Sequence, residues 1–121
     1  MNINWNSNFI DLQNLIDISR GDKNRTLKYL IQFQELIPER IENLKESLQE
    51  KDRKKTRQIV HKMSPQLKFF GIPDIEVLIL RLELEYTTMP LEDLNSLVND
   101  MLIKLESAVK EVDLILESNF T

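Results

Sequence analysis

The sequence predicts an all-α fold, an antiparallel up-and-down four-helix bundle with an additional N-terminal helix. Apolar residues recur at steps of three and four along five segments, the spacing that gathers them on one face of a helix. Only two glycines occur in 121 residues and 30% of the residues are charged, a composition that favours helices over sheet. A chain of this length predicts one domain, residues 1–121, with a single packed core.

The first helix is expected to begin near Ser7 or Asn8, which are both good N-cap residues, and to run to about Arg20. Gly21 then ends it. The residues expected to point inward are Phe9, Leu12, Leu15, Ile16 and Ser19.

Asp22 opens the second helix, which is expected to continue across Pro38 to a charged turn at residues 50–52. The apolar spacing is unbroken across the proline, and this favours one kinked helix over two helices. Its predicted inward face comprises Leu27, Leu30, Ile31, Gln34, Ile37, Ile41, Leu44 and Leu48. A second stripe, Tyr29, Phe33 and Leu36, is interpreted as core or as a patch for docking a partner.

The third predicted helix has two faces of opposite character. Its apolar face carries Thr56, Ile59, Val60, Met63, Leu67 and Phe70, and its polar face carries Lys54, Arg57, His61, Ser64 and Lys68. His61 is the only histidine of the chain. We therefore expect its imidazole to be exposed to solvent among cations, near the middle of the helix.

Gly71 and Pro73 stop the third helix, and Asp74 is expected to cap the next. That fourth helix, residues 75–86, has only a narrow polar edge and is predicted to be the most buried. Pro90 suits the first turn of the last helix. The last helix has apolar residues at heptad-like spacing, Leu91, Leu94, Val98, Met101, Leu105, Ala108, Val112 and Ile115, which favour a seam within a monomer over a coiled-coil dimer.

The run from His61 to Gly71 resembles the signature of histidine-containing phosphotransfer (HPt) domains. In that family an exposed helix histidine is followed, in order, by a basic or polar residue, an apolar residue, a residue that is usually lysine, and Gly or Pro. A glycine stands ten positions after the histidine. Here these places hold His61, Lys62, Met63, Ser64, Pro65 and Gly71, so Ser64 departs from the usual lysine. The positions of Gly21-Asp22, Phe33, Pro38 and residues 50–52 also fit the family, and the resemblance spans about residues 9–116.

The resemblance implies a phosphoryl carrier of a multistep two-component phosphorelay. His61 would accept a phosphoryl group from the aspartate of a response-regulator receiver domain, including receivers of hybrid sensor histidine kinases, and pass it to another receiver. The receiver would supply Mg2+, and this chain would need no cofactor and have no kinase activity of its own. The alternative is a helical bundle that binds a receiver or another helical partner without being phosphorylated.

Each residue near His61 has both a functional and a structural interpretation. Lys68 is interpreted as a contact for the phosphoryl group or as a solvated lysine, and Lys62 as a residue that steers a partner. The Ser64 hydroxyl is expected to donate a hydrogen bond at the site or to the carbonyl of Val60. Gly71 is a C-cap or a point of close approach. The residues predicted to dock the partner are Lys54, Arg57, Phe33 and Phe69.

Charge is distributed unevenly along the chain. Residues 51–68 contain seven Lys and Arg against one Asp, a net +6 within a chain of net charge −4. Such a segment suits an acidic or phosphorylated partner. Nucleic-acid binding is disfavoured, because the whole chain is acidic and no aromatic residue interleaves with residues 51–57.

Other functional classes find no support in the sequence. The absence of cysteine and the single histidine exclude disulfides, thiol catalysis and His/Cys metal sites. No glycine-rich phosphate loop indicates ATP binding. Neither a targeting segment nor a membrane-length apolar run occurs, so a cytoplasmic protein is expected.

Overall fold

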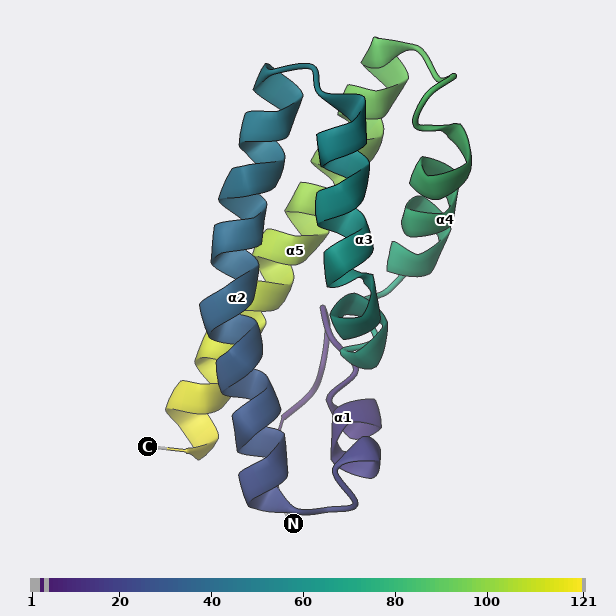
Figure 1. Ribbon diagram of the computed structural model, residues 1–121. Coiled ribbons are helices and arrows are strands. Elements are labelled where there is room, and N and C mark those ends of the chain that lie inside the picture. Colours follow the sequence, from purple (N-terminus) through teal and green to yellow (C-terminus); the bar gives the residue numbers. More distant parts are fainter. Residues whose placement is uncertain (1–2, 4, 121) are drawn as a thin grey trace.

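The computed structural model describes residue 3 and residues 5–120, which form five helices and no strand. The helices are α1 (Leu12–Ile18), α2 (Lys23–Gln49), α3 (Arg53–Phe69), α4 (Ile75–Glu85) and α5 (Leu91–Asn119). Helices α2 to α5 run up and down in turn, and each packs against two neighbours around a closed ring (Figure 1). The predicted all-α bundle with an additional N-terminal helix is confirmed.

Unequal helix lengths explain the place of α1. Helices α2 and α5 contain 27 and 29 residues, whereas α3 and α4 contain 17 and 11, so the shorter pair covers only part of the longer pair. Figure 1 shows α1 beyond the end of α3, beside the first turns of α2. The backbone N–H of Asp11 donates to the carbonyl of Phe70 at 2.8 Å, and Leu12 and Leu15 are buried. The N-terminal helix thus completes the apolar cover of the long pair.

The first helix begins later than the sequence suggests. It starts at Leu12, with Asp11 as the N-cap whose side chain accepts from the N–H of Asn14, so the expected start near Ser7 or Asn8 is wrong. The cause is Glu111 of α5, a buried carboxylate. It accepts hydrogen bonds of 3.0–3.3 Å from the N–H groups of residues 8–10. Those donors are therefore satisfied by a distant side chain and not by helix formation.

The predicted inward position of Phe9 is also wrong, because its side chain is 47% exposed in this extended segment.

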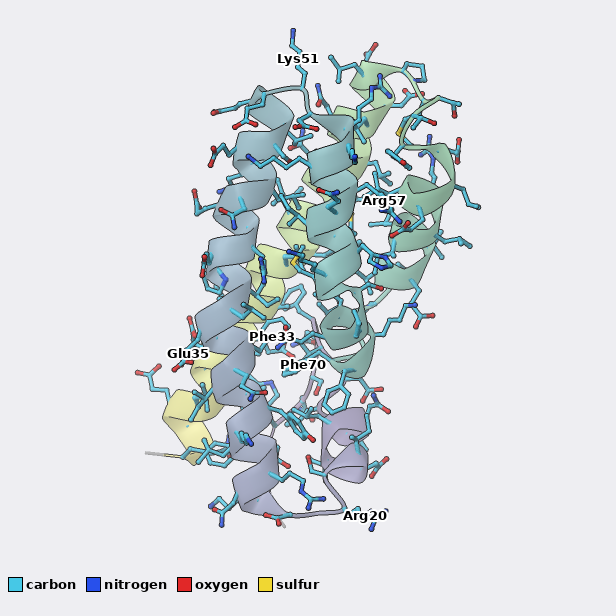
Figure 2. The ribbon with its side chains drawn as sticks, in the orientation of Figure 1. Arg20, Phe33, Glu35, Lys51, Arg57 and Phe70 are labelled. Carbon is cyan, nitrogen blue, oxygen red and sulfur yellow. The ribbon has the colours of Figure 1, made fainter. Side chains whose placement is uncertain are left out.

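Helix α2 continues through Pro38, as predicted, but its buried face is rotated from the expected one. Phe33 is fully buried and stacks on Phe70, with ring centroids 4.2 Å apart (Figure 2). Ile31, which was expected to point inward, is 36% exposed. The prediction of Phe33 as a docking residue is therefore wrong, because a partner cannot reach it.

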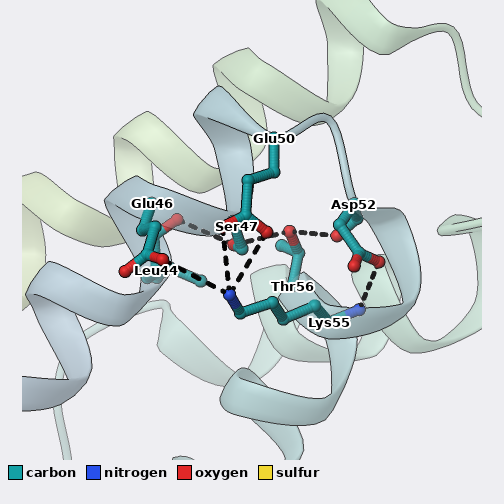
Figure 3. A network of polar contacts seen from close by, with 7 residues as sticks. All are labelled: Leu44, Glu46, Ser47, Glu50, Asp52, Lys55 and Thr56. Atoms are coloured by element: carbon teal, nitrogen blue, oxygen red, sulfur yellow. Dashed lines mark hydrogen bonds and ion pairs between the residues drawn. The ribbon is translucent and has the colours of Figure 1, made fainter.

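The apolar face of α3 is buried as predicted, from Thr56 to Phe70. Two buried hydroxyls fix its register against α2, because Ser47 Oγ and Thr56 Oγ1 lie 2.8 Å apart at the turn between the helices (Figure 3). Asp52 caps α3 by accepting from the N–H of Lys55, and Thr56 Oγ1 donates to the carbonyl of Asp52. This network holds the start of α3 at one place on α2.

Helix α4 is not the most buried helix, and that prediction is wrong. Ile75, Ile79 and Leu82 face the core, while the other large aliphatic side chains of α4 face outward or lie half-buried. Asp74 occupies the N-cap position with φ +63°, but its side chain makes no capping hydrogen bond within the described chain.

Helix α5 packs along α2, and its predicted apolar positions from Leu94 to Ile115 are buried, so the expected intramolecular seam is confirmed. No helix in the described residues is long and apolar enough to cross a membrane.

Gly71 combines both roles that the sequence left open. Its φ of +60° ends α3 in the left-handed region, and a Cβ placed on it would lie 2.6 Å from Cβ of Asp11. Gly21 has a similar φ of +72° but nothing within 4 Å of such a Cβ. A side chain at Gly21 would therefore meet backbone strain alone, whereas one at Gly71 would meet the same strain and a steric clash.

We expect Gly21→Ala to lower the free energy of unfolding by about 1 kcal/mol, the strain of a left-handed alanine. Gly71→Ala should lower it by about 3 kcal/mol, because the clash with Asp11 adds to the same strain. Urea unfolding of both variants measures the difference. Equal losses would show that the N-terminal segment moves away without cost.

Candidate functional site

His61 lies near the middle of α3, and its side chain is 65% exposed. The predicted exposure is confirmed. Val60 and Met63, which are close to it in the sequence but lie on the other face of the helix, are buried in the core. The core thus presents the imidazole outward without the imidazole contributing to packing.

A carboxylate from α4 holds the imidazole. Glu83 Oε1 lies 2.9 Å from Nδ1 of His61, and Oε2 accepts from Nε of Arg57 at 3.0 Å. Arg57 precedes His61 by one helical turn, and its guanidinium also lies over the ring of Tyr86 at 5.6 Å. In Figure 2 the Arg57 side chain projects from α3 toward α4. Contacts thus run in sequence from His61 to Glu83, Arg57 and Tyr86, and they join α3 to α4 and its C-cap.

Glu83 is ionised at neutral pH. Its partial burial raises the pKa of the carboxyl, but hydrogen bonds from His61 and Arg57, together with their positive charge, outweigh burial and hold the pKa below its ordinary value. An ionised carboxylate only accepts hydrogen bonds, so Nδ1 of His61 carries the hydrogen. When the ring is uncharged, its lone pair is therefore on Nε2, which Glu83 does not contact.

A groove between α3 and α4 contains His61. Its α3 wall carries His61, Ser64 and Lys68, and its α4 wall includes Leu80 and Glu83. Ser64 was expected on the solvent face, and this is wrong, because α4 leaves the side chain only 8% exposed. No hydrogen bond from its hydroxyl to the carbonyl of Val60 is present in the described chain.

The cations near His61 fall into two groups. Lys54, Lys62 and Lys68 are exposed and form no ion pair with any described residue. Arg53, Lys55 and Arg57 are engaged by carbonyls or carboxylates of neighbouring segments, as in the pairing of Lys55 with Glu46 and Glu50 (Figure 3). Carboxylates lie among these cations as well, because α4 brings Glu83 and Glu76 to the groove that contains His61. Gly71, which was also predicted to support the site, lies at the end of α3, where it allows the close approach of Asp11.

The aromatic docking patch predicted on α2 and α3 is largely internal. Phe69 is half-buried and packs edge-on against Tyr29, with ring centroids 4.7 Å apart. It borders a separate groove on the α2 side of α3, together with Gln32 and Pro65. Of the predicted docking residues, Lys54 is exposed, Arg57 is half-buried by its contact with Glu83, and Phe33 is inaccessible.

Glu83 is the residue of the candidate site that the sequence did not reveal. The signal available was the polar edge of the fourth helix, where Glu76 and Glu83 stand one heptad apart on a strongly apolar segment. That spacing places two carboxylates on one side, but only the packing of α4 on α3 brings one of them to the histidine. No cluster of three or more potential metal ligands occurs among the described residues.

The fold and the site together define a helical bundle built around one exposed mid-helix histidine. The solved structure of the HPt domain from a sensor hybrid histidine kinase of Shewanella has this fold. It superposes with a TM-score of 0.80 and 19% sequence identity, covering 93% of this chain and 97% of that domain. The chain therefore has the fold of an HPt domain. No protein-family model and no curated protein matches the sequence.

The lowered pKa of Glu83 makes its contribution to stability depend on pH. The contribution is present at neutral pH, above the ordinary pKa of a glutamate, and is lost as the pH falls through the lowered value. We expect Glu83→Gln to lower the free energy of unfolding at pH 7 by about 1 kcal/mol and to have little effect at pH 3.

Urea unfolding at the two pH values provides the measurement. The matched control is Glu85→Gln, on the same helix, because Glu85 pairs with Arg81 at 3.5 Å on an exposed surface and should change stability little at either pH. A loss that is the same at pH 3 and pH 7 would contradict the ion-pair account.

Proposed function

We propose that this chain is a histidine phosphotransfer protein of a two-component phosphorelay. His61 accepts a phosphoryl group from the aspartate of one receiver domain and passes it to another. The observation that supports this most directly is the exposed imidazole at the middle of α3, with Nδ1 occupied by Glu83, in a bundle with the HPt fold. The chain acts as a phosphoryl carrier, and the receiver supplies Mg2+ and the acidic pocket.

The proposed transfer needs no proton movement. The Nε2 lone pair attacks phosphorus, the P–O bond of the acyl phosphate breaks, and the receiver's aspartate leaves as a carboxylate. The ring then carries phosphate on Nε2 and hydrogen on Nδ1, with a positive charge beside Glu83. In the second transfer a receiver carboxylate attacks phosphorus, the P–N bond breaks, and its electron pair returns to Nε2. Glu83 stabilises the same charged ring in both directions.

The three exposed lysines support this proposal, because their positive charge attracts an acidic partner. Lys54, Lys62 and Lys68 lie on the same helix as the histidine and are not held by carboxylates of the described chain, so their positive charge faces the solvent. Such a charge raises the association rate of an acidic partner more than it raises affinity. Lys68 also lines the His61 groove, where its ammonium can follow the phosphoryl group.

The decisive experiment incubates the chain with a receiver domain that carries a radiolabelled phosphoryl group. His61→Gln should abolish acid-labile labelling while the free energy of unfolding stays within about 0.5 kcal/mol of the parent, because the side chain is exposed. Labelling that persists in the variant would move the phosphoacceptor to another residue. Receiver binding without labelling of the parent would favour the alternative, an unphosphorylated interaction module.

Glu83 provides a second and more specific test of the mechanism. Glu83→Gln keeps an acceptor for Nδ1 but removes the charge, so transfer in a single-turnover assay should slow about tenfold, equivalent to about 1.4 kcal/mol. Glu83→Ala removes both and should slow transfer further. Glu85→Gln, on the same helix but outside the groove, should match the parent. A Glu83→Gln rate equal to that of the parent would contradict the role of the negative charge.

A further inference from the structure

Helix α4 exposes a row of large apolar side chains. Val77, Leu80 and Leu84 are 68%, 59% and 72% exposed, and their spacing places them on one side of the helix. We call these three residues the α4 stripe. Ile75, Ile79 and Leu82 supply the buried contacts of the same helix, so the stripe is not needed to attach α4 to the bundle.

The α4 stripe adjoins the candidate site. Leu80 lines the groove that contains His61, and Val77 borders the neighbouring depression with Lys68. Any protein that brings an acyl phosphate to Nε2 of His61 must cover this groove, and it then meets Leu80. The stripe therefore lies within the footprint of a phosphodonor.

We infer that the α4 stripe is the apolar half of the surface that docks the receiver domain, an inference that rests on the proposed function. The partner surface that fits is an apolar ridge bordered by acidic side chains. The ridge covers the stripe, and the acidic groups face Lys68, which is exposed and lines the α3 wall of the adjoining His61 groove. Apolar contact supplies affinity, and the opposite charges supply orientation and association rate.

A second copy of this chain is a poorer occupant. Pairing α4 with α4 of another copy would cover the groove and block access to His61. Three side chains on an 11-residue helix also provide far less than the surface that stable protein complexes bury, about 1,200–2,000 Å². A small apolar patch beside an exposed lysine, Lys68, suits a short-lived complex, which a carrier that must leave one partner for another requires.

The surface on the other side of α3 offers less. Phe33 is in the core, and Phe69 is half-covered by its contact with Tyr29. The large apolar side chains of α4 are therefore more exposed than the aromatic ones on this side of α3. This reverses the expectation from the sequence, in which α4 is internal and the aromatic residues of α2 and α3 form the patch.

The test replaces Val77 and Leu84, the two residues of the stripe outside the His61 groove, together by serine. The matched control is Leu114→Ser, a 50%-exposed leucine on α5, in the half of that helix remote from α4 (Figure 1). From the receiver domains of the source organism, the one that binds the parent chain most tightly is titrated calorimetrically against all three proteins. Transfer from its phosphorylated form and labelling by phosphoramidate, a small donor that needs no docking, are measured in parallel.

We expect the double variant to bind at least tenfold more weakly and to need a correspondingly higher concentration for half-maximal transfer. Labelling by phosphoramidate should be unchanged, and Leu114→Ser should match the parent. Unchanged receiver affinity in the double variant would overturn the docking surface, as would absence of receiver binding to the parent. So would a parent dimer, seen by sedimentation, that the double variant dissociates.

Receiver binding to the parent without labelling of His61 would instead overturn the proposed phosphotransfer, while the affinities would still decide whether the α4 stripe is the docking surface.

Discussion

One face of α3 is buried against the other helices of the bundle, and this burial determines where the imidazole points. The face consists of Thr56, Ile59, Val60, Met63 and Leu67. Turning α3 far enough to hide His61 would expose these side chains, at a cost of about 1.5–3 kcal/mol for each large aliphatic one. The contact between Ser47 and Thr56 opposes sliding of α3 along α2 in the same way. The histidine is held in place by the core beneath it, so its own atoms remain available for chemistry.

Helix α4 contributes the carboxylate that contacts the histidine of α3. Two of its residues outside the core have different surroundings. Glu83 contacts the imidazole, and Leu80 continues the groove as apolar surface. Both depend on three buried anchors, Ile75, Ile79 and Leu82. A helix attached by so few contacts can present polar and apolar groups side by side, since its remaining positions are not needed for packing.

The sequence predicted the elements whose two faces differ sharply and failed where the outcome depends on a distant neighbour. The apolar and charged faces of α3 are unambiguous, so the burial of Met63 and the exposure of His61 followed from helical geometry. Helix α4 is apolar nearly all round, and no local pattern reveals that it packs on one side only. The burial of Ser64 follows from the position of α4, and Phe33 is buried because Phe70 stacks on it. None of these contacts has a local signal.

The buried carboxylate of Glu111 joins the extended segment before α1 to the last helix, across a separation of 103 residues. During synthesis α2 and α3 can pair with each other early, whereas residues 8–10 have no acceptor until α5 has left the ribosome. Docking of the N-terminal segment is thus a late, long-range loop closure, which is entropically slower than local helix pairing. Docking of residues 8–10 must therefore wait until the last of the five helices is available.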